Sequence, residues 1–239
     1  FWMFLITALL VCIWFSIRLD ETLLPESRQP LSFRKIRNGM IEVLKTRTAL
    51  GYTLATGFLF SPFVGYLSSS QQIFADGYGK KDEFPLLFAS LALTFGVASL
   101  VNARLVYRYG LKRLCFASVS VITGLSGIFL LGILGMDKMP PLWLFMGYMM
   151  IIFPGIGFLF GNLNALAMEP LGHIAGVGAA MIGSLSSLIS IPLGILIAGV
   201  FNGTVLPLVT GFSLCGLAVL FSIIWAEKNP QSKVVVENP

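Results

Sequence analysis

Glu169 and His173 are the two side chains whose types and spacing come nearest to a chemical site. A spacing of four residues places them on one side of a helix, where a carboxylate and an imidazole could both bind a metal ion. Pro170 and Gly172 interrupt that helix, however, and two ligands are fewer than a metal site requires. The sequence therefore favours an interfacial turn at this point and predicts no metal site.

Catalysis by a nucleophile also has little support. His173 is the one histidine of the chain, and Cys12, Cys115 and Cys215 lie in or beside apolar runs, where we expect them to pack. An enzyme embedded in a membrane would need a nucleophile and a base, or several metal ligands, to converge at membrane depth. We therefore predict no catalytic residues, no enzyme activity and no cofactor.

The composition is that of an integral membrane protein. Of the 239 residues, 56% are hydrophobic, 13% are aromatic and only 11% are charged, and the mean hydropathy is +0.86. A soluble domain of this size does not tolerate so apolar a composition. We therefore expect the lipid bilayer to be the main partner of the chain.

Uncharged runs long enough to span a bilayer follow one another along the chain. A hydrocarbon layer of about 30 Å needs roughly 20 apolar helical residues. The runs lack the alternation of a lipid-facing β-strand, so we expect helices and an all-α, polytopic membrane helix bundle. Seven such runs occur, at residues 1–17, 48–75, 84–103, 114–136, 141–167, 174–200 and 205–226.

The polar segments between the runs suggest the domain organisation. The run 1–17 lacks the basic region and cleavage site of a signal peptide, so we expect it to be the end of a transmembrane helix that a further N-terminal portion precedes. The polar residues 18–47 would form a cytoplasmic loop between two bundles. Residues 48–226 would then form a six-helix bundle, and residues 227–239 a cytoplasmic tail.

Positive charge separates sharply between alternate loops. Lys and Arg are retained on the cytoplasmic side of a membrane, so the richer side is expected to be cytoplasmic, and the net charge of +5 does not require a nucleic-acid partner. Three of the 16 cations, Lys80, Lys81 and Lys138, fall on one side. The other side carries thirteen: Arg18, Arg28, Arg34, Lys35, Arg37, Lys45, Arg47, Arg104, Arg108, Lys112, Arg113, Lys228 and Lys233.

The six runs after residue 47 resemble two triples. A shift of 92 residues places Pro62 on Pro154 and brings the following runs approximately into register. An odd number of helices separates the copies, so the repeats would have inverted topology, which is common in secondary transporters.

The densest cationic segment is VNARLVYRYGLKRL at residues 101–114, which we expect to form a short turn between two helices. It resembles the loop signature between the second and third helices of each bundle in the major facilitator superfamily. The basic and glycine positions match, although Tyr107 replaces the usual acid and Ala103 the usual glycine. These residues could anchor the chain at the cytoplasmic side of the membrane, form a cytoplasmic gate, or do both. The residues of this turn are Arg104, Arg108, Gly110, Lys112 and Arg113.

A second segment, GNLNALAMEPLGHIAGVGAAMIGSLSSLIS at residues 161–190, resembles the tenth to eleventh helices of the Bcr/CflA drug-resistance transporters. SPF at 61–63 and NAR at 102–104 are also similar to that family. The resemblance implies the sixth to twelfth helices, and hence the C-terminal half, of a protein of the bacterial inner membrane. It implies proton-coupled antiport that exports small amphipathic compounds by alternating access, with an N-terminal six-helix bundle as partner. A transporter of another small metabolite and a non-transporting scaffold remain alternatives.

Polar and small residues along two of the runs are candidates for a substrate cavity. Spacings of three or four residues place them on one stripe of each helix, and such a stripe should avoid lipid. Hydrogen bonding and close packing between helices explain the same pattern, but the resemblance favours a cavity, because the seventh and tenth helices line it in the superfamily. The candidates are Ser61, Gly65, Ser68 and Gln72 in the run 48–75 and Tyr148, Gly155 and Asn162 in the run 141–167.

Small residues in the run 174–200 and just before it allow another backbone to approach closely. We predict that they form an interface on which two bundles slide: Gly172, Gly176, Ala180, Gly183, Ser187 and Pro192.

Overall fold

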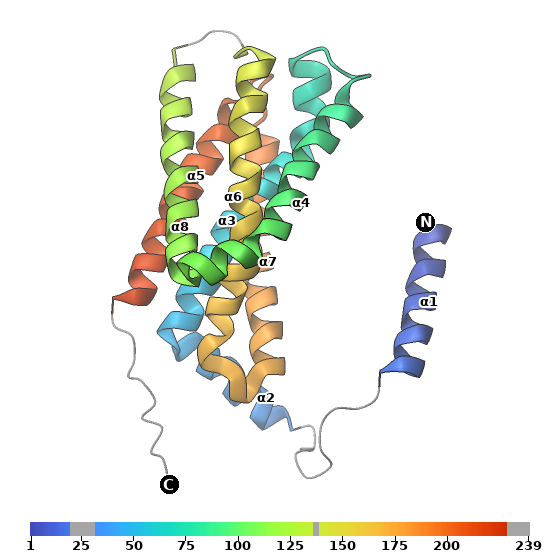
Figure 1. The fold of residues 1–239 in the computed structure, drawn as a ribbon, viewed down its shortest axis with the longest axis vertical. Helices are drawn as coiled ribbons and strands as arrows, with labels where there is room; N and C mark the ends of the chain where they lie inside the picture. The colour runs from blue at the N-terminus through green and yellow to red at the C-terminus, as the bar shows by residue number, and fades with distance from the viewer. Residues whose placement is uncertain (20–31, 136–138, 229–239) are drawn as a thin grey trace. The chain divides into compact units, whose positions relative to one another are not determined.

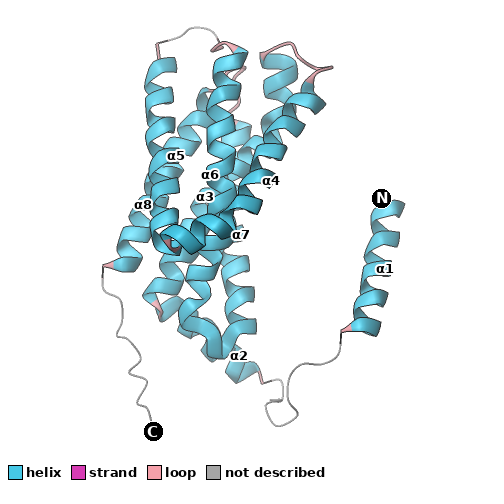
Figure 2. Cartoon of the chain, in the orientation of Figure 1, coloured by secondary structure: helices cyan, strands magenta, loops and turns pink. Residues whose placement is uncertain are grey.

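The computed structural model describes residues 1–19, 32–135 and 139–228, and within these ranges the regular elements are all helices (Figures 1 and 2). The predicted all-α fold class is confirmed. The chain divides into two compact units, residues 1–36 and 37–239. The first unit contains α1, Trp2–Arg18, an apolar helix of 17 residues.

The second unit is a bundle built from the remaining helices. Five helical segments are long and apolar enough to cross a membrane, and the longest, Leu142–Gly199, reverses direction once and so holds two helices. The elements are α2 (Phe33–Lys45, which begins in the first unit), α3 (Arg47–Gln72) with a π-helical turn (Ile73–Gly77), α4 (Phe84–Tyr109), α5 (Leu111–Ile133), α6 (Leu142–Met168) with a 3-10 turn (Glu169–Ile174), α7 (Ala175–Gly199) and α8 (Leu206–Glu227).

Two helices extend further than the apolar runs suggest. Helix α4 continues through Arg104 and Arg108 to Tyr109, and α5 begins at Leu111, so the expected cationic turn shrinks to Gly110 with φ +80°. The expectation of a longer turn was wrong because charge ends an apolar run without ending a helix. The backbone reverses only where a residue without Cβ adopts positive φ.

The expected loop 18–47 also contains a helix. Residues 20–31, which hold both of its prolines, lie outside the described residues. From Phe33 onward the sequence FRKIRNGMIEVLK has no helix breaker except Gly39 and alternates apolar and basic residues with a helical period, and it forms α2.

Helices α3 and α6 organise the bundle. Helix α3 packs mainly on α7 and α8, whereas α6 packs mainly on α4 and α5, and the two also contact each other. Exchanging α3 with α6, α4 with α7 and α5 with α8 leaves this pattern unchanged. The arrangement agrees with the inverted repeat inferred from sequence.

A proline followed three residues later by a glycine marks the middle of both central helices. A methyl group added at Gly65 in α3 would lie 3.3 Å from the carbonyl oxygen of Gly194 in α7. A methyl added at Gly157 in α6 would lie 3.1 Å from the carbonyl oxygen of Phe95 in α4. Gly65 and Gly157 are 92 residues apart, so both halves of the repeat place a glycine where another backbone comes close.

Candidate functional site

Of the four cavity candidates on α3, two are packed inside the bundle and two are exposed. Ser61 is fully buried and donates its hydroxyl hydrogen to the carbonyl of Gly57 at 2.8 Å, and Gly65 faces α7. Ser68 and Gln72, one to two turns further along, are exposed. The structure therefore does not bring the four residues onto one common surface.

On α6, Tyr148 and Gly155 contact α5. The hydroxyls of Tyr148 and Ser126 share a hydrogen bond of 2.8 Å, and the Tyr148 ring stacks on Phe129 with 4.4 Å between ring centroids. A methyl group at Gly155 would lie 2.9 Å from two carbon atoms of Ile122. Both residues lie in a helix contact inside this bundle.

Asn162 has a partner that the sequence argument did not identify. Its amide donates to Oδ1 of Asn102 at 2.9 Å, and the amide of Asn102 donates back to Oδ1 of Asn162 at 3.0 Å. This reciprocal pair joins α6 to α4 where Asn162 is buried. An amide within an apolar helix needs a polar partner, and Asn102 is another amide within an apolar run, so the sequence signals the need for a partner without stating which helix supplies it.

A hollow of about 420 Å³ lies between α5 and α6, and Gly155 is the predicted cavity residue that lines it. Its wall is almost wholly apolar, as expected of a surface that lipid or a hydrophobic ligand would fill. The lining residues are Leu114, Ala117, Ser118, Val121, Met150, Ile151, Pro154, Gly155 and Phe158. The seven cavity candidates do not converge on this hollow, and their role in substrate binding stays a prediction.

The predicted interface residues of α7 and the turn before it lie on an open face. Methyl groups added at Gly172, Gly176 and Gly183 would meet no atom within 4 Å in the described structure. Ala180, Ser187 and Pro192 are also exposed. The residue types that allow close approach are thus present on a face that this bundle leaves uncovered.

Helix α4 carries a second face of this kind, which the sequence argument missed. Its exposed residues Ala89, Ala92 and Gly96 lie 91 residues before Ala180, Gly183 and Ser187, and Ser99 and Ala103 continue the same face. Only two of the 26 residues of α4, Leu91 and Ala98, are buried. The repeat shift of 92 residues pairs Ala180, Gly183 and Ser187 with the larger residues Phe88, Leu91 and Phe95, so the two faces match only when the shift is one residue shorter.

Charged and aromatic side chains tie three helices together at one end of the bundle. The ammonium of Lys112 on α5 lies 2.9 Å from Oε1 of Glu227 on α8, and the hydroxyl of Tyr52 on α3 donates to the same oxygen at 2.7 Å. Nearby, Arg47 donates from Nε to the carbonyl of Trp225 at 2.7 Å, and its guanidinium lies 5.0 Å from the Trp225 ring centroid. The side chains of Lys112 and Glu227 are 50% and 35% exposed, so solvent weakens their ion pair.

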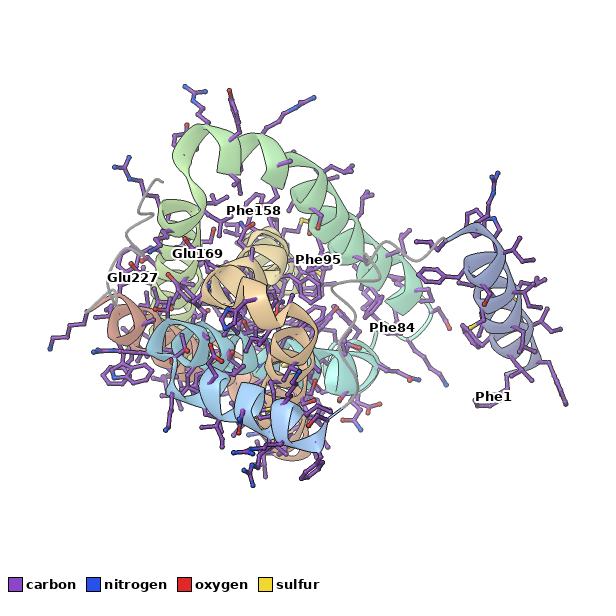
Figure 3. All side chains as sticks on the ribbon, turned by 90° about the horizontal axis from the view of Figure 1, so that it is seen from below. Phe1, Phe84, Phe95, Phe158, Glu169 and Glu227 are labelled. Carbon is purple, nitrogen blue, oxygen red and sulfur yellow. The ribbon has the colours of Figure 1, made fainter. Side chains whose placement is uncertain are left out.

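A cavity of about 560 Å³ lies beside Gly110 at this same end. Three of the predicted gate residues line it, namely Gly110, Lys112 and Arg113, and Glu169, which follows the end of α6, also lines it. Arg108 instead places its guanidinium 5.4 Å from the ring of Tyr109. Figure 3 shows the end of the molecule to which Glu169 and Glu227 belong.

His173, in the turn between α6 and α7, contacts helix α2. Its Nε2 lies 2.7 Å from Oε1 of Glu42 on α2, so the imidazole contacts a carboxylate other than Glu169. Within the described ranges, no three His, Cys, Asp or Glu side chains come together in a way that would hold a metal ion.

Two curated proteins are similar to most of this chain. The uncharacterized MFS-type transporter YdgK of Bacillus subtilis is 28% identical over 191 residues, which are 79% of this chain and 46% of that protein. The chain is a relative of major facilitator superfamily transporters. The bicyclomycin resistance protein homolog of Haemophilus influenzae is 25% identical over 224 residues, 90% of this chain and 54% of that protein. The resemblance to the superfamily and its Bcr/CflA branch is thereby confirmed.

The chain spans about half the length of the curated relatives it matches. No family model matches the chain. No solved structure matches it either. With its long apolar helices, this major facilitator relative is a multi-pass membrane protein.

Proposed function

We propose that this chain forms one bundle of a secondary transporter that exports small amphipathic compounds. The observation that carries the proposal is the similarity, over 90% of the chain, to a protein named as a bicyclomycin resistance homolog. Transport of another small metabolite is the second candidate, because the other relative is named only as an MFS-type transporter.

The proposed mechanism is alternating access between this bundle and an N-terminal six-helix bundle. The open small-residue faces of α4 and α7 support it, because such faces let a second set of helices approach and slide. The seven cavity candidates would contribute to one wall of the transport path. Ser68 and Gln72 are the two whose polar side chains are exposed for this purpose.

We propose that the proton-coupling group lies in the partner bundle. The carboxylates in the described ranges, Glu42, Asp76, Asp82, Glu83, Glu169 and Glu227, lie in α2 or at the ends of spanning helices and in the turns between them. A proton carrier in a transporter is usually a carboxylate at membrane depth. Asp20, Glu21, Glu26, Asp137 and Glu237 lie outside the described residues.

The proposed location is the bacterial inner membrane, with the loop 18–47 and the tail in the cytoplasm. Arg47, Lys112 and Arg113 lie at the same end of the bundle as Glu227, whereas Lys80 pairs with Glu83 at the other end. This distribution supports the orientation, because Lys and Arg accumulate on the cytoplasmic side.

Export is tested with the complete coding sequence in a bacterial strain that lacks its own drug exporters. Cells expressing the protein should accumulate less bicyclomycin, or less of another amphipathic drug, than cells with an empty vector, and a protonophore should abolish the difference. Unchanged accumulation for every compound of this class would contradict the proposed substrates. Residues 1–239 alone in liposomes with an imposed pH gradient should give no flux above that of protein-free vesicles.

A further inference from the structure

Helix α2 is attached to the bundle along one side. A methyl group added at Gly39 would lie 3.1 Å from Cγ1 of Val177 on α7, and Val43 is fully buried. Glu42 reaches His173 at 2.7 Å, immediately before α7 begins. The helix therefore has a fixed side against the start of α7.

The adjoining side of α2 is apolar and uncovered. Met40, Ile41 and Leu44 are 39%, 40% and 46% exposed. At about 100° per residue, Met40 and Leu44 lie next to the buried Val43, and Ile41 lies further round the helix between Arg37 and Lys45. The uncovered side thus begins with two apolar residues and continues with Ile41 between two cations.

The position of α2 in the chain places this uncovered side at a membrane surface. Thr46 is the one residue between α2 and the spanning helix α3, so α2 lies where that span leaves the hydrocarbon. Figure 3 shows α2 crossing the end of the bundle instead of continuing along its axis. A basic amphipathic helix at that depth binds with its apolar side in the boundary between head groups and acyl chains.

We propose that α2 is an interfacial anchor that binds a surface of anionic phospholipids. Met40, Ile41 and Leu44 insert between the lipids, and Arg37 and Lys45 contact the lipid phosphates. Each cation near an anionic surface favours the inserted state by about fivefold, and salt screens this contribution. Because Gly39 and Glu42 contact the start of α7, the lipid surface fixes the position of the helix that carries the open small-residue face.

Lipid quenching of a fluorophore tests the insertion directly. In the full chain with Cys12, Cys115 and Cys215 replaced by serine, an environment-sensitive label is attached to Met40→Cys or, as the matched control on the polar side, to Asn38→Cys. The proteins are reconstituted in vesicles of phosphatidylcholine alone or mixed with phosphatidylglycerol, each containing brominated lipid. The label at position 40 should be quenched several times more than the label at position 38, and phosphatidylglycerol should increase that quenching.

The dependence of quenching on the charges of α2 and of the lipids is the second test. R37Q/K45Q should remove most of the phosphatidylglycerol effect at position 40, and high salt should do the same. A label on Leu44→Cys repeats the measurement if the Met40 variant does not fold. Equal quenching at positions 40 and 38, or quenching that ignores phosphatidylglycerol, overturns the proposal. Quenching at position 40 that decreases as the protein-to-lipid ratio rises also overturns the proposal, because Met40, Ile41 and Leu44 would then bind a second copy of the chain.

Discussion

Helices α3 and α6 differ from α4 and α7 in where their small and polar residues point. In the central pair, Gly65 and Gly157 contact neighbouring backbones. In the outer pair, Gly96 and Gly183 face no atom within 4 Å in the described structure. A glycine at these positions therefore serves a contact inside the bundle on α3 and α6 and is left without a protein contact on α4 and α7.

Helix α7 carries both a glycine packed against another helix and a glycine without any contact in the described structure. A methyl group added at Gly194 would lie 2.6 Å from Cγ1 of Val64 and 2.9 Å from the carbonyl oxygen of Ser61, whereas one added at Gly183 would meet nothing. A glycine on the first side is needed for folding. A glycine on the second side leaves space for something outside this bundle, which we propose to be the second bundle.

The largest effect is expected for Gly194→Val. The added side chain overlaps α3, and because one of the atoms in its way belongs to the backbone, the overlap is not relieved by a rotamer change. We expect a loss of about 3 kcal/mol in the free energy of unfolding of the purified chain in detergent micelles, measured by denaturant titration. Gly183→Val is the matched control on the same helix. Similar losses for both variants would remove the distinction between the two sides of α7.

A smaller loss is expected for Asn162→Leu. It leaves the amide of Asn102 without its partner inside the helix contact, which should cost about 1 to 2 kcal/mol. The double variant N102L/N162L should recover part of that loss, since no unpaired amide remains. A double variant whose loss equals the sum of the two single losses would show that the amides act independently, and Asn162 would then be free to contact a substrate.

The sequence was sufficient to predict the membrane-spanning helices and insufficient to predict which of them contact one another. The lengths of the uncharged runs predict the spanning helices, and the shift that places Pro62 on Pro154 predicts a repeat of three helices. The observed helices and their packing agree with both. The partner of Asn162 could not be assigned, because a helical period states which side a residue lies on and not which helix meets that side. Helix α2 was missed because its charges were taken as a loop signal, although its apolar residues already had a helical period.

Lys112→Gln should have an effect below about 1 kcal/mol, because the ion pair with Glu227 is partly exposed. Raising the salt concentration should reduce the difference between this variant and the wild type further, since the ions screen exposed charges. Denaturant titration at two salt concentrations measures both quantities. A loss above 2 kcal/mol that salt does not change would mean that this end of the bundle is held as firmly as the contact between α3 and α7.

The smallest effect on the stability of the bundle is expected for Gly96→Leu and Gly183→Leu, one on each open face. A Cβ atom added at either position meets no atom of the described structure within 4 Å, and leucine favours a helix more than glycine does, so the free energy of unfolding should not fall. In the complete transporter the same changes should prevent close approach of the second bundle and abolish drug export while membrane abundance stays normal. Leu131→Ala, at a position on α5 that is 74% exposed and belongs to neither open face, is the control, because shortening a side chain that the second bundle does not meet should leave both stability and export unchanged. Normal export by both leucine variants would show that these faces contact lipid alone. The contrast between the central and outer helices would then concern packing within one bundle and not the meeting of two.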